Sequence, residues 1–126
     1  MLHAKAAFSG ISVDDQDKAK EFYTEILGLK LHDEEMGLTF SLPGGGSLFM
    51  YAKDDHKPAT FTVLNFVVDD IDEAVDALIE KGVKFEKYEG FHQDEKGIAR
   101  GKAANMGPDI AWFKDPSGNI LSVLQN

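Results

Sequence analysis

Two stretches of the chain place apolar residues at the spacing of one helix face. In the first stretch these residues are Ala19, Phe22, Tyr23, Ile26 and Leu27. Asp14 and Asp15 precede the stretch as candidate N-caps, and Gly28 follows it as a helix stop. The pattern predicts an amphipathic helix between Asp15 and Gly28.

The second stretch repeats this arrangement with a cleaner apolar stripe. Its apolar residues are Ile71, Ala74, Val75, Leu78 and Ile79. Asp69 and Asp70 stand before it as candidate N-caps, and Gly82 stands after it. We therefore expect a second helix that ends at Gly82.

Short runs of β-branched, aromatic and aliphatic residues surround both helices and predict strands. The predicted strands cover residues 6–13, 29–33, 38–42, 47–52, 60–68, 83–88, 110–113 and 119–125. We expect tight turns at 43–46, where proline precedes three glycines, and at 115–118, where the sequence is Asp-Pro-Ser-Gly. Residues 89–107 are polar and contain several glycines, which predicts a long loop or a lid.

The two halves of the chain form an internal repeat. The Val-Asp-Asp triplet at 13–15 recurs at 68–70, and each half reads as β-α-β-β-β. We predict an α+β fold of two tandem modules in a single domain, residues 1–126. Module one covers 5–52, a linker covers 53–59, and module two covers 60–126. The alternative is that two unrelated αβ segments resemble each other by chance.

Composition limits the partners and the compartment. The chain has 126 residues, a net charge of −9 and no cysteine. An acidic surface repels phosphate groups, so we expect neither nucleic acid nor an anionic membrane as a partner. The lack of cysteine excludes disulfides, thiolate metal sites and cysteine nucleophiles. We find no signal peptide and no apolar run long enough to span a bilayer, and therefore expect a cytoplasmic protein.

Two sequence motifs connect this repeat with a known family. Residues 112–121, WFKDPSGNIL, carry the more specific motif, and residues 68–74, VDDIDEA, carry the other. Ala19, Phe22 and Tyr23 add a third similarity, before the Leu-Gly-Leu sequence at 27–29. Over essentially the whole chain, the sequence resembles the vicinal oxygen chelate superfamily of glyoxalases, bleomycin resistance proteins and dioxygenases. The resemblance implies mixed sheets that curl into a cup, helices on the outside, and a homodimer.

Metalloenzymes of this superfamily hold a divalent metal on the first and last strand of each module. The corresponding positions in this chain are Phe8, Phe49, Val63 and Ser122. These side chains lack the carboxylate, imidazole and amide groups that bind such metals. We therefore expect no metal and no other cofactor. A divalent metal remains the alternative, with His92 and Glu95 in the long loop as its candidate ligands.

A small-molecule site is usually an apolar hollow with a few polar groups. If the sheets curl as the resemblance implies, the predicted ligand-binding residues that line the cup are Phe8, Ser12, Phe40, Phe49, Tyr51, Val63, Asn65, Trp112 and Ser122. The first functional hypothesis is thus a small organic molecule bound there without metal, as in bleomycin resistance proteins. The alternative is that the large apolar residues among them fill the cup as core.

Two other functions stay open. The resemblance also fits a divalent-metal-dependent glyoxalase-like lyase or isomerase, or a ring-cleaving dioxygenase, although we identify no acid–base pair and no catalytic residue. A third hypothesis is an interaction or regulatory protein whose cup is closed. The loop at 90–106 adds the hypothesis that it closes over the cup and that Arg100 and Lys102 favour an anionic ligand.

Overall fold

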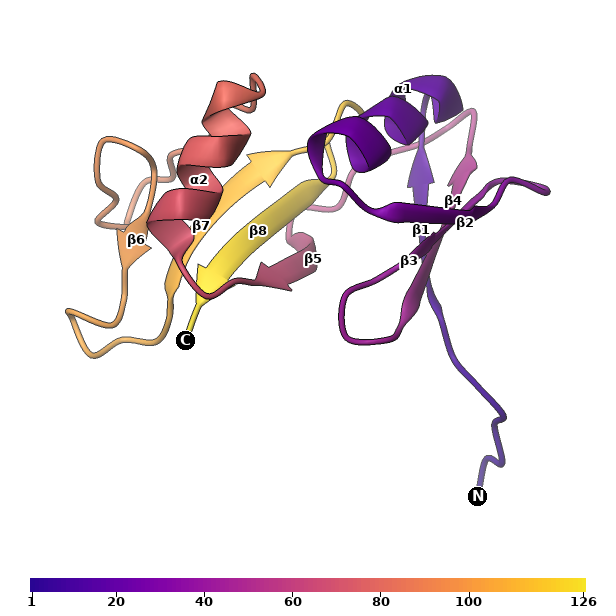
Figure 1. Ribbon diagram of the computed structural model, residues 1–126, viewed down its shortest axis with the longest axis horizontal. Helices are drawn as coiled ribbons and strands as arrows, with labels where there is room; N and C mark the ends of the chain where they lie inside the picture. The colour runs from indigo at the N-terminus through magenta and orange to yellow at the C-terminus, as the bar shows by residue number, and fades with distance from the viewer. The chain divides into compact units, whose positions relative to one another are not determined.

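The computed structural model describes all 126 residues, and the chain divides into two compact units, 1–57 and 58–126 (Figure 1). Each unit has its own four-stranded sheet, its own helix and its own buried apolar residues.

The first unit begins with a strand and a helix and ends with three strands. Its elements are β1 (Ser9–Val13), α1 (Gln16–Glu21), the π-helical turn η1 (Phe22–Ile26), β2 (Lys30–Asp33), β3 (Leu38–Ser41) and β4 (Ser47–Ala52). The strand order is β1-β4-β3-β2, with β1 parallel to β4 and the other neighbours antiparallel. The last strand of the unit therefore lies between its first and third strands.

The predicted ends of the first helix are confirmed. The Asp15 carboxylate accepts a hydrogen bond from the Lys18 backbone N–H at 3.0 Å, and Gly28 follows the helix at φ 72°. Glycine adopts this left-handed backbone without steric cost, so the chain can leave the helix there. Just before this point the Leu27 N–H donates to the carbonyl of Phe22, five residues earlier, at 3.1 Å, which makes the last turn π-helical.

The second unit repeats this topology. Its elements are β5 (Thr62–Val67), α2 (Ile71–Glu80), β6 (Ala99–Arg100), β7 (Asp109–Lys114) and β8 (Ile120–Gln125). The strand order β5-β8-β7-β6 matches the order in the first unit, and β5 is again parallel to β8. The predicted α+β fold with a repeated module is therefore confirmed.

The second helix also begins where the sequence predicts. The Asp70 carboxylate accepts a hydrogen bond from the Glu73 N–H at 3.0 Å, which caps the first turn. The Ile71 N–H donates to the side chain of Gln125 at 2.9 Å and so joins the helix start to β8. Gly82 follows the helix at φ 93°.

The predicted strand at 83–88 is wrong. Phe85 alone of this segment pairs with β7, through a bridge to Phe113, and the Glu86 N–H donates to the carbonyl of Trp112 at 2.8 Å. The chain then leaves the sheet and returns to the same edge of β7 at β6. The strand ends early because the next backbone groups form hydrogen bonds within the loop instead of with β7.

The predicted tight turn between β7 and β8 contains a buried carboxylate. Asp115 is only 5% exposed, and its Oδ1 accepts hydrogen bonds from the N–H groups of Ser117 and Asn119, both at 2.9 Å. Its Oδ2 accepts a third from the Asn119 side chain, also at 2.9 Å. Side-chain as well as backbone hydrogen bonds therefore fix this turn.

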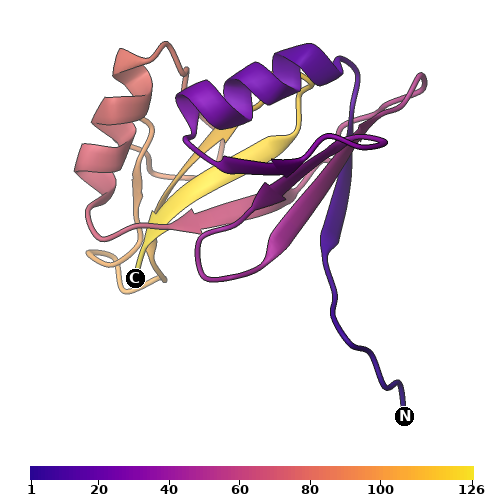
Figure 2. The same ribbon diagram turned by 45° about the vertical axis from the view of Figure 1, so that its right-hand side comes forward.

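Each sheet packs one face against the helix of its own unit (Figures 1 and 2). In the second unit, Ile71 and Val75 of α2 are buried where the helix meets β7 and β8. In the first unit, Tyr23 lies against Phe40 of β3, with 5.7 Å between the ring centroids. The opposite face of each sheet carries no helix of its own unit, and we call it the open face.

Candidate binding site

The floor of the candidate site is the open face of the second sheet. Thr62 of β5 is in register with Ile120 of β8, and Trp112 of β7 is in register with Ser122 of β8. Because side chains alternate along a strand, positions 120 and 122 share one face, as do their neighbours Thr62 and Trp112. Leu121, between them, is fully buried on the helix side.

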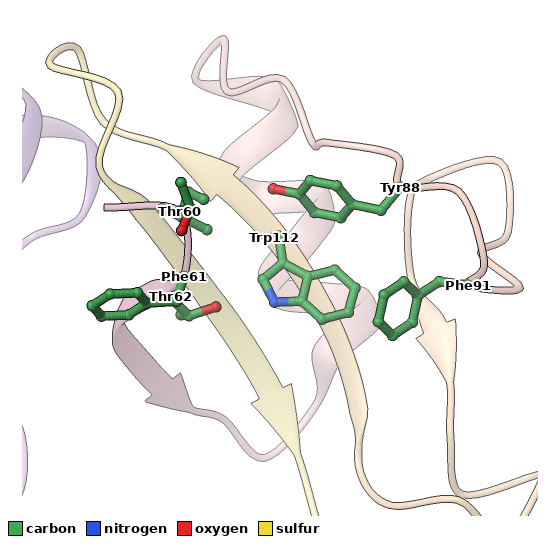
Figure 3. Close-up of a pocket in the computed structure, with 7 residues that line it drawn as sticks. Thr60, Phe61, Thr62, Tyr88, Phe91 and Trp112 are labelled. Atoms are coloured by element: carbon green, nitrogen blue, oxygen red, sulfur yellow. The ribbon is translucent and has the colours of Figure 1, made fainter. Parts of the chain in front are cut away.

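Two aromatic side chains from the connection between α2 and β6 stand over this floor (Figure 3). The rings of Tyr88 and Phe91 lie 5.5 Å and 5.1 Å from the ring of Trp112, one edge-to-face and the other tilted. Thr60 and Phe61 line the opposite side of the hollow in this view. Together with Thr62 and Ile120 these residues enclose an aromatic pocket of about 220 Å³.

The side chain of Gln93 fixes the aromatic wall. Its Oε1 accepts a hydrogen bond from the Tyr88 N–H at 2.8 Å. Its Nε2 donates to the carbonyls of Glu86 at 2.9 Å and Gly97 at 2.7 Å. One half-buried side-chain amide therefore holds three points of the connection between α2 and β6.

The hydroxyl of Tyr88 is the one buried side-chain polar atom of the protein that has no hydrogen-bond partner. In Figure 3 its oxygen points toward the side of the pocket where Thr60 lies. Burial raises the pKa of Tyr88 above its ordinary value of 10.0, and the negative charge of Glu86 adds to this effect. At neutral pH the phenol is therefore protonated, and it can donate a hydrogen bond into the pocket.

A second hollow, of about 320 Å³, adjoins the aromatic pocket and shares Phe91 and Trp112 with it. Its other lining residues are Gly90, His92, Ala99, Arg100, Gly101, Ala104, Met106, Pro108 and Ile110. Most of them belong to the segment that the sequence predicts as a loop or lid. That segment therefore forms one wall of a hollow on the open face.

The basic residues of this loop are engaged by groups of their own unit. Arg100 donates to both carboxylate oxygens of Asp72 in α2, at 2.7 and 3.0 Å, and to Asp94 at 3.1 Å. The hydrogen bond from Arg100 lowers the pKa of the Asp72 carboxyl below its ordinary 3.8. Lys102 donates to the backbone carbonyl of Asn126 at 3.2 Å. These hydrogen bonds fasten the loop to its own unit, and attraction of an anionic ligand by the two cations stays a prediction.

The first unit brings four of the predicted residues together on its open face. Phe49 lies between Phe8, with 6.5 Å between ring centroids, and Tyr51, with 5.9 Å and nearly parallel rings. Ser12, in register with Tyr51, has its Oγ 2.6 Å from Nδ1 of His56. The result is a row of three aromatic rings beside a hydroxyl–imidazole pair.

Phe40 does not lie on this face, which corrects its prediction as a lining residue. It is fully buried against Tyr23 on the helix side of the sheet. Its neighbour in register, Leu48, is also buried, whereas Thr39 is in register with Phe49 on the open face. Alternation along β3 therefore assigns Phe40 to the core.

The remaining predicted residues belong to the second unit. The Ser122 hydroxyl donates to Oδ1 of Asn65 at 2.5 Å beneath the open face. Val63 lies where the register between β5 and β8 shifts. Of the predicted residues, Trp112 is the one that lines both hollows.

Sequence reasoning did not identify Tyr88 and Phe91, which form the aromatic wall. The sequence pattern puts Tyr88 in a predicted strand and Phe91 in a predicted polar loop. The available signal was a pair of aromatic residues three positions apart at the start of a segment rich in glycine and charge. Solvated loops seldom need such residues, so the pair indicates a loop that folds back onto an apolar surface.

The four positions that correspond to superfamily metal ligands do not fit a divalent metal ion. Phe8, Phe49 and Val63 have no donor atom in their side chains, and the Ser122 hydroxyl is bonded to Asn65. No three His, Cys, Asp or Glu side chains are grouped so that they could hold a metal ion. We therefore derive no chemical step through a metal.

The repeated module and its open-faced sheet define the class of protein: a small α+β protein built from two β-α-β-β-β modules. The family model of the Glyoxalase/Bleomycin resistance protein/Dioxygenase superfamily matches residues 3–123. The chain belongs to this superfamily, which confirms the resemblance found in its sequence.

Individual relatives are distant but cover the whole chain. The chain is 26% identical to a "Probable lactoylglutathione lyase" of Vibrio parahaemolyticus, over 100% of this chain and 94% of the relative. A superfamily member from Sphaerobacter thermophilus has 27% identity and a TM-score of 0.73, with 99% of this chain and 100% of that chain covered. TnmS3 from Streptomyces sp. CB03234, described as an antibiotic binding protein, has 26% identity and a TM-score of 0.71, with 99% and 98% covered. Neither helix of this protein is long and apolar enough to cross a membrane.

Proposed function

We propose that the protein binds a small organic molecule in the aromatic pocket of its second unit, and that it does so without metal. The observation that carries this proposal is the contact of Tyr88 and Phe91 with Trp112 above the open sheet face. Clustered aromatic rings offer a ligand a large apolar contact area in a fixed geometry. An apolar wall with a few polar groups is the usual composition of a small-molecule site.

The comparisons support a binding role. TnmS3 covers nearly the whole chain at 26% identity and is described as an antibiotic binding protein. That description fits a protein with this fold that binds an organic molecule. We extend the binding role, and not the particular antibiotic, to this chain.

The metal-free part of the proposal rests on the chemistry of four positions. Binding through a divalent metal would need oxygen or nitrogen donors where this chain has Phe8, Phe49 and Val63. At the fourth position, the hydroxyl of Ser122 is bonded to Asn65. Apolar contacts and single hydrogen bonds need no metal, and the aromatic pocket offers both.

A thermal-shift screen of small aromatic compounds, followed by calorimetry on the compounds that stabilise the protein, tests the proposal. Trp112→Leu should weaken the binding of such a compound by about tenfold or more, because it removes the central ring of the pocket. Tyr51→Leu is the matched control, since Tyr51 is an open-face aromatic of the other unit and lines neither hollow. The control should bind as the unaltered protein does, and so should protein dialysed against a chelator. Equal weakening in both variants, or loss of binding after chelation, would contradict the proposal.

A second candidate function is a metal-dependent lyase, and the observation in its favour is the lactoylglutathione lyase relative that aligns with the entire chain. We expect no lactoylglutathione lyase activity when nickel or zinc is added to the purified protein, because three of the four corresponding positions lack donor atoms. Turnover that depends on added metal would support the lyase and remove the metal-free binding function.

A further inference from the structure

We infer that the aromatic pocket takes an uncharged, planar aromatic ligand with a carbonyl or ether oxygen, and that the hydroxyl of Tyr88 donates a hydrogen bond to this oxygen. The inference rests on the proposed function and adds to it the chemical class of the ligand and the residue that recognises its polar atom.

The size and walls of the pocket set the shape of the ligand. The pocket measures about 220 Å³, which is below the range of about 300–1,000 Å³ typical of drug-sized ligands. Four aromatic residues line it: the rings of Trp112, Tyr88 and Phe91 are grouped on one side, and the ring of Phe61 points away from them (Figure 3). Aromatic pairs prefer offset-stacked and edge-to-face arrangements, and both are available to a flat molecule that enters among these rings. Two or three fused rings suit the space better than a bulky saturated ligand does.

The unsatisfied hydroxyl defines one polar feature of the ligand. A buried hydroxyl without a partner is unfavourable, and native proteins satisfy nearly all such groups. Tyr88 lines the pocket, and its hydroxyl oxygen is buried and has no partner within the protein. An acceptor atom of a ligand in the pocket would accept a hydrogen bond from the Tyr88 hydroxyl. Binding would then remove the free-energy cost of the unpaired hydroxyl.

The charge of the ligand follows from the charge of the lining. No charged residue is among those that line the aromatic pocket. The polar side-chain groups of the lining residues are the hydroxyls of Thr60, Thr62 and Tyr88 and the indole N–H of Trp112. Two cations of the loop are already paired: Arg100 with Asp72 and Asp94, and Lys96 with Asp76 at 2.8 Å. A carboxylate or phosphate would lose its hydration in the pocket without gaining a counter-charge. An uncharged acceptor avoids this cost.

Three matched probes separate the parts of the inference: 9-fluorenone, fluorene, which lacks the carbonyl, and 9-fluorenone-2-carboxylate, which adds a negative charge. Binding is followed by calorimetry and by the indole N–H signal in the nuclear magnetic resonance spectrum. Trp112 is the one tryptophan of the chain, so a shift of that signal reports on the aromatic pocket. We expect fluorenone to bind about tenfold more tightly than either other probe, as one well-formed hydrogen bond allows.

Tyr88→Phe is the matched variant, because it removes the hydroxyl and keeps the ring against Trp112. It should lower the affinity for fluorenone about tenfold, to the affinity for fluorene, and leave fluorene binding unchanged. The variant should fold as the unaltered protein does, since the deleted hydroxyl has no partner within the protein.

The possible outcomes also separate this inference from the proposed function. If all three probes shift the indole signal with equal affinity, or if Tyr88→Phe weakens fluorene as much as fluorenone, the inference is overturned and a binding pocket remains. Tightest binding of the carboxylate would likewise overturn the inference alone. If no probe shifts the signal, the inferred ligand class is wrong, and the broader screen with Trp112→Leu then decides whether the pocket binds any organic molecule.

Discussion

Asp115 and Tyr88 carry buried polar groups in opposite hydrogen-bonding situations. The Asp115 carboxylate accepts three hydrogen bonds, whereas the Tyr88 hydroxyl has no partner within the protein. The effect of a substitution on stability depends mainly on whether it leaves buried donors and acceptors without partners. The two residues should therefore respond differently to loss of their polar groups.

At Asp115 we expect a large loss of stability. Asp115→Ala leaves the N–H groups of Ser117 and Asn119 without their acceptor, and should lower the free energy of unfolding by about 2–3 kcal/mol in urea titrations. Asp54→Ala is the control at an exposed position and should change stability by less than about 0.5 kcal/mol. A result for Asp115→Ala as small as for the control would mean that the turn does not depend on this carboxylate.

At Tyr88 we expect a dependence on alkaline pH. Burial raises its pKa above 10.0 in the folded state, so its contribution to stability is complete below pH 10 and is lost as the pH rises above that value. Unfolding free energies measured between about pH 8 and pH 11 should fall less steeply for Tyr88→Phe than for the unaltered protein. Parallel curves for the two proteins would show that Tyr88 does not titrate abnormally.

The site could be predicted from the sequence only in part, and the reason is visible residue by residue. The sequence indicates Trp112 because this residue belongs to a regular strand beside a recognisable turn motif. The sequence around Phe40 does not determine which face of the sheet its side chain occupies. That face is determined by the register of Phe40 with the buried residue Leu48. Tyr88 and Phe91 were missed because their contacts with Trp112 depend on a loop conformation that no periodicity encodes.

At the scale of elements, local signals predicted the helices well. Asp15 and Asp70 cap the two helices, and Gly28 and Gly82 follow them in the left-handed conformation, as the sequence indicates. These features depend on a few neighbouring residues. The predicted strand at 83–88 is wrong because of Gln93, which lies outside this segment. Its side chain forms hydrogen bonds with the Tyr88 N–H and the Glu86 carbonyl, so these groups do not pair with β7.

Gln93 therefore provides a test at this scale. Gln93→Ala removes three hydrogen bonds that hold the connection between α2 and β6, so hydrogen exchange of the Tyr88 amide should accelerate about tenfold or more. Glu95→Ala changes an exposed residue of the same loop and serves as the control. If both variants exchange this amide at the unaltered rate, the wall is held by its aromatic contacts instead.

At the scale of the whole molecule, the repeat of one module explains why the fold could be predicted so fully. Both units use the same strand order, with the last strand between the first and the third. The first strands, β1 and β5, are consequently edge strands of their sheets. Phe61, just before β5, and Val67 within it are each 67% exposed. Edges that expose apolar residues are commonly covered by another strand or another chain.

We accordingly keep the prediction of a homodimer. Sedimentation velocity at micromolar concentration should give the mass of two chains. Val67→Lys, which places a charge at the exposed edge of β5, should shift the equilibrium toward one chain if this edge takes part. The mass of a single chain for the unaltered protein would reject the prediction.

The position of β8 between β5 and β7 also has a consequence during synthesis on the ribosome. The sheet of the second unit lacks its central strand until Ile120–Gln125 has been made, so β5 has no partner while the intervening chain emerges. The first unit has its central strand once Ala52 has emerged, and can complete its sheet while the rest of the chain is still being translated. Nascent chains stalled before β8 should therefore resist protease over the first unit while the second is still digested. The strand that completes the second sheet also supplies Ile120 to the aromatic pocket, so this pocket forms only after β8 has emerged.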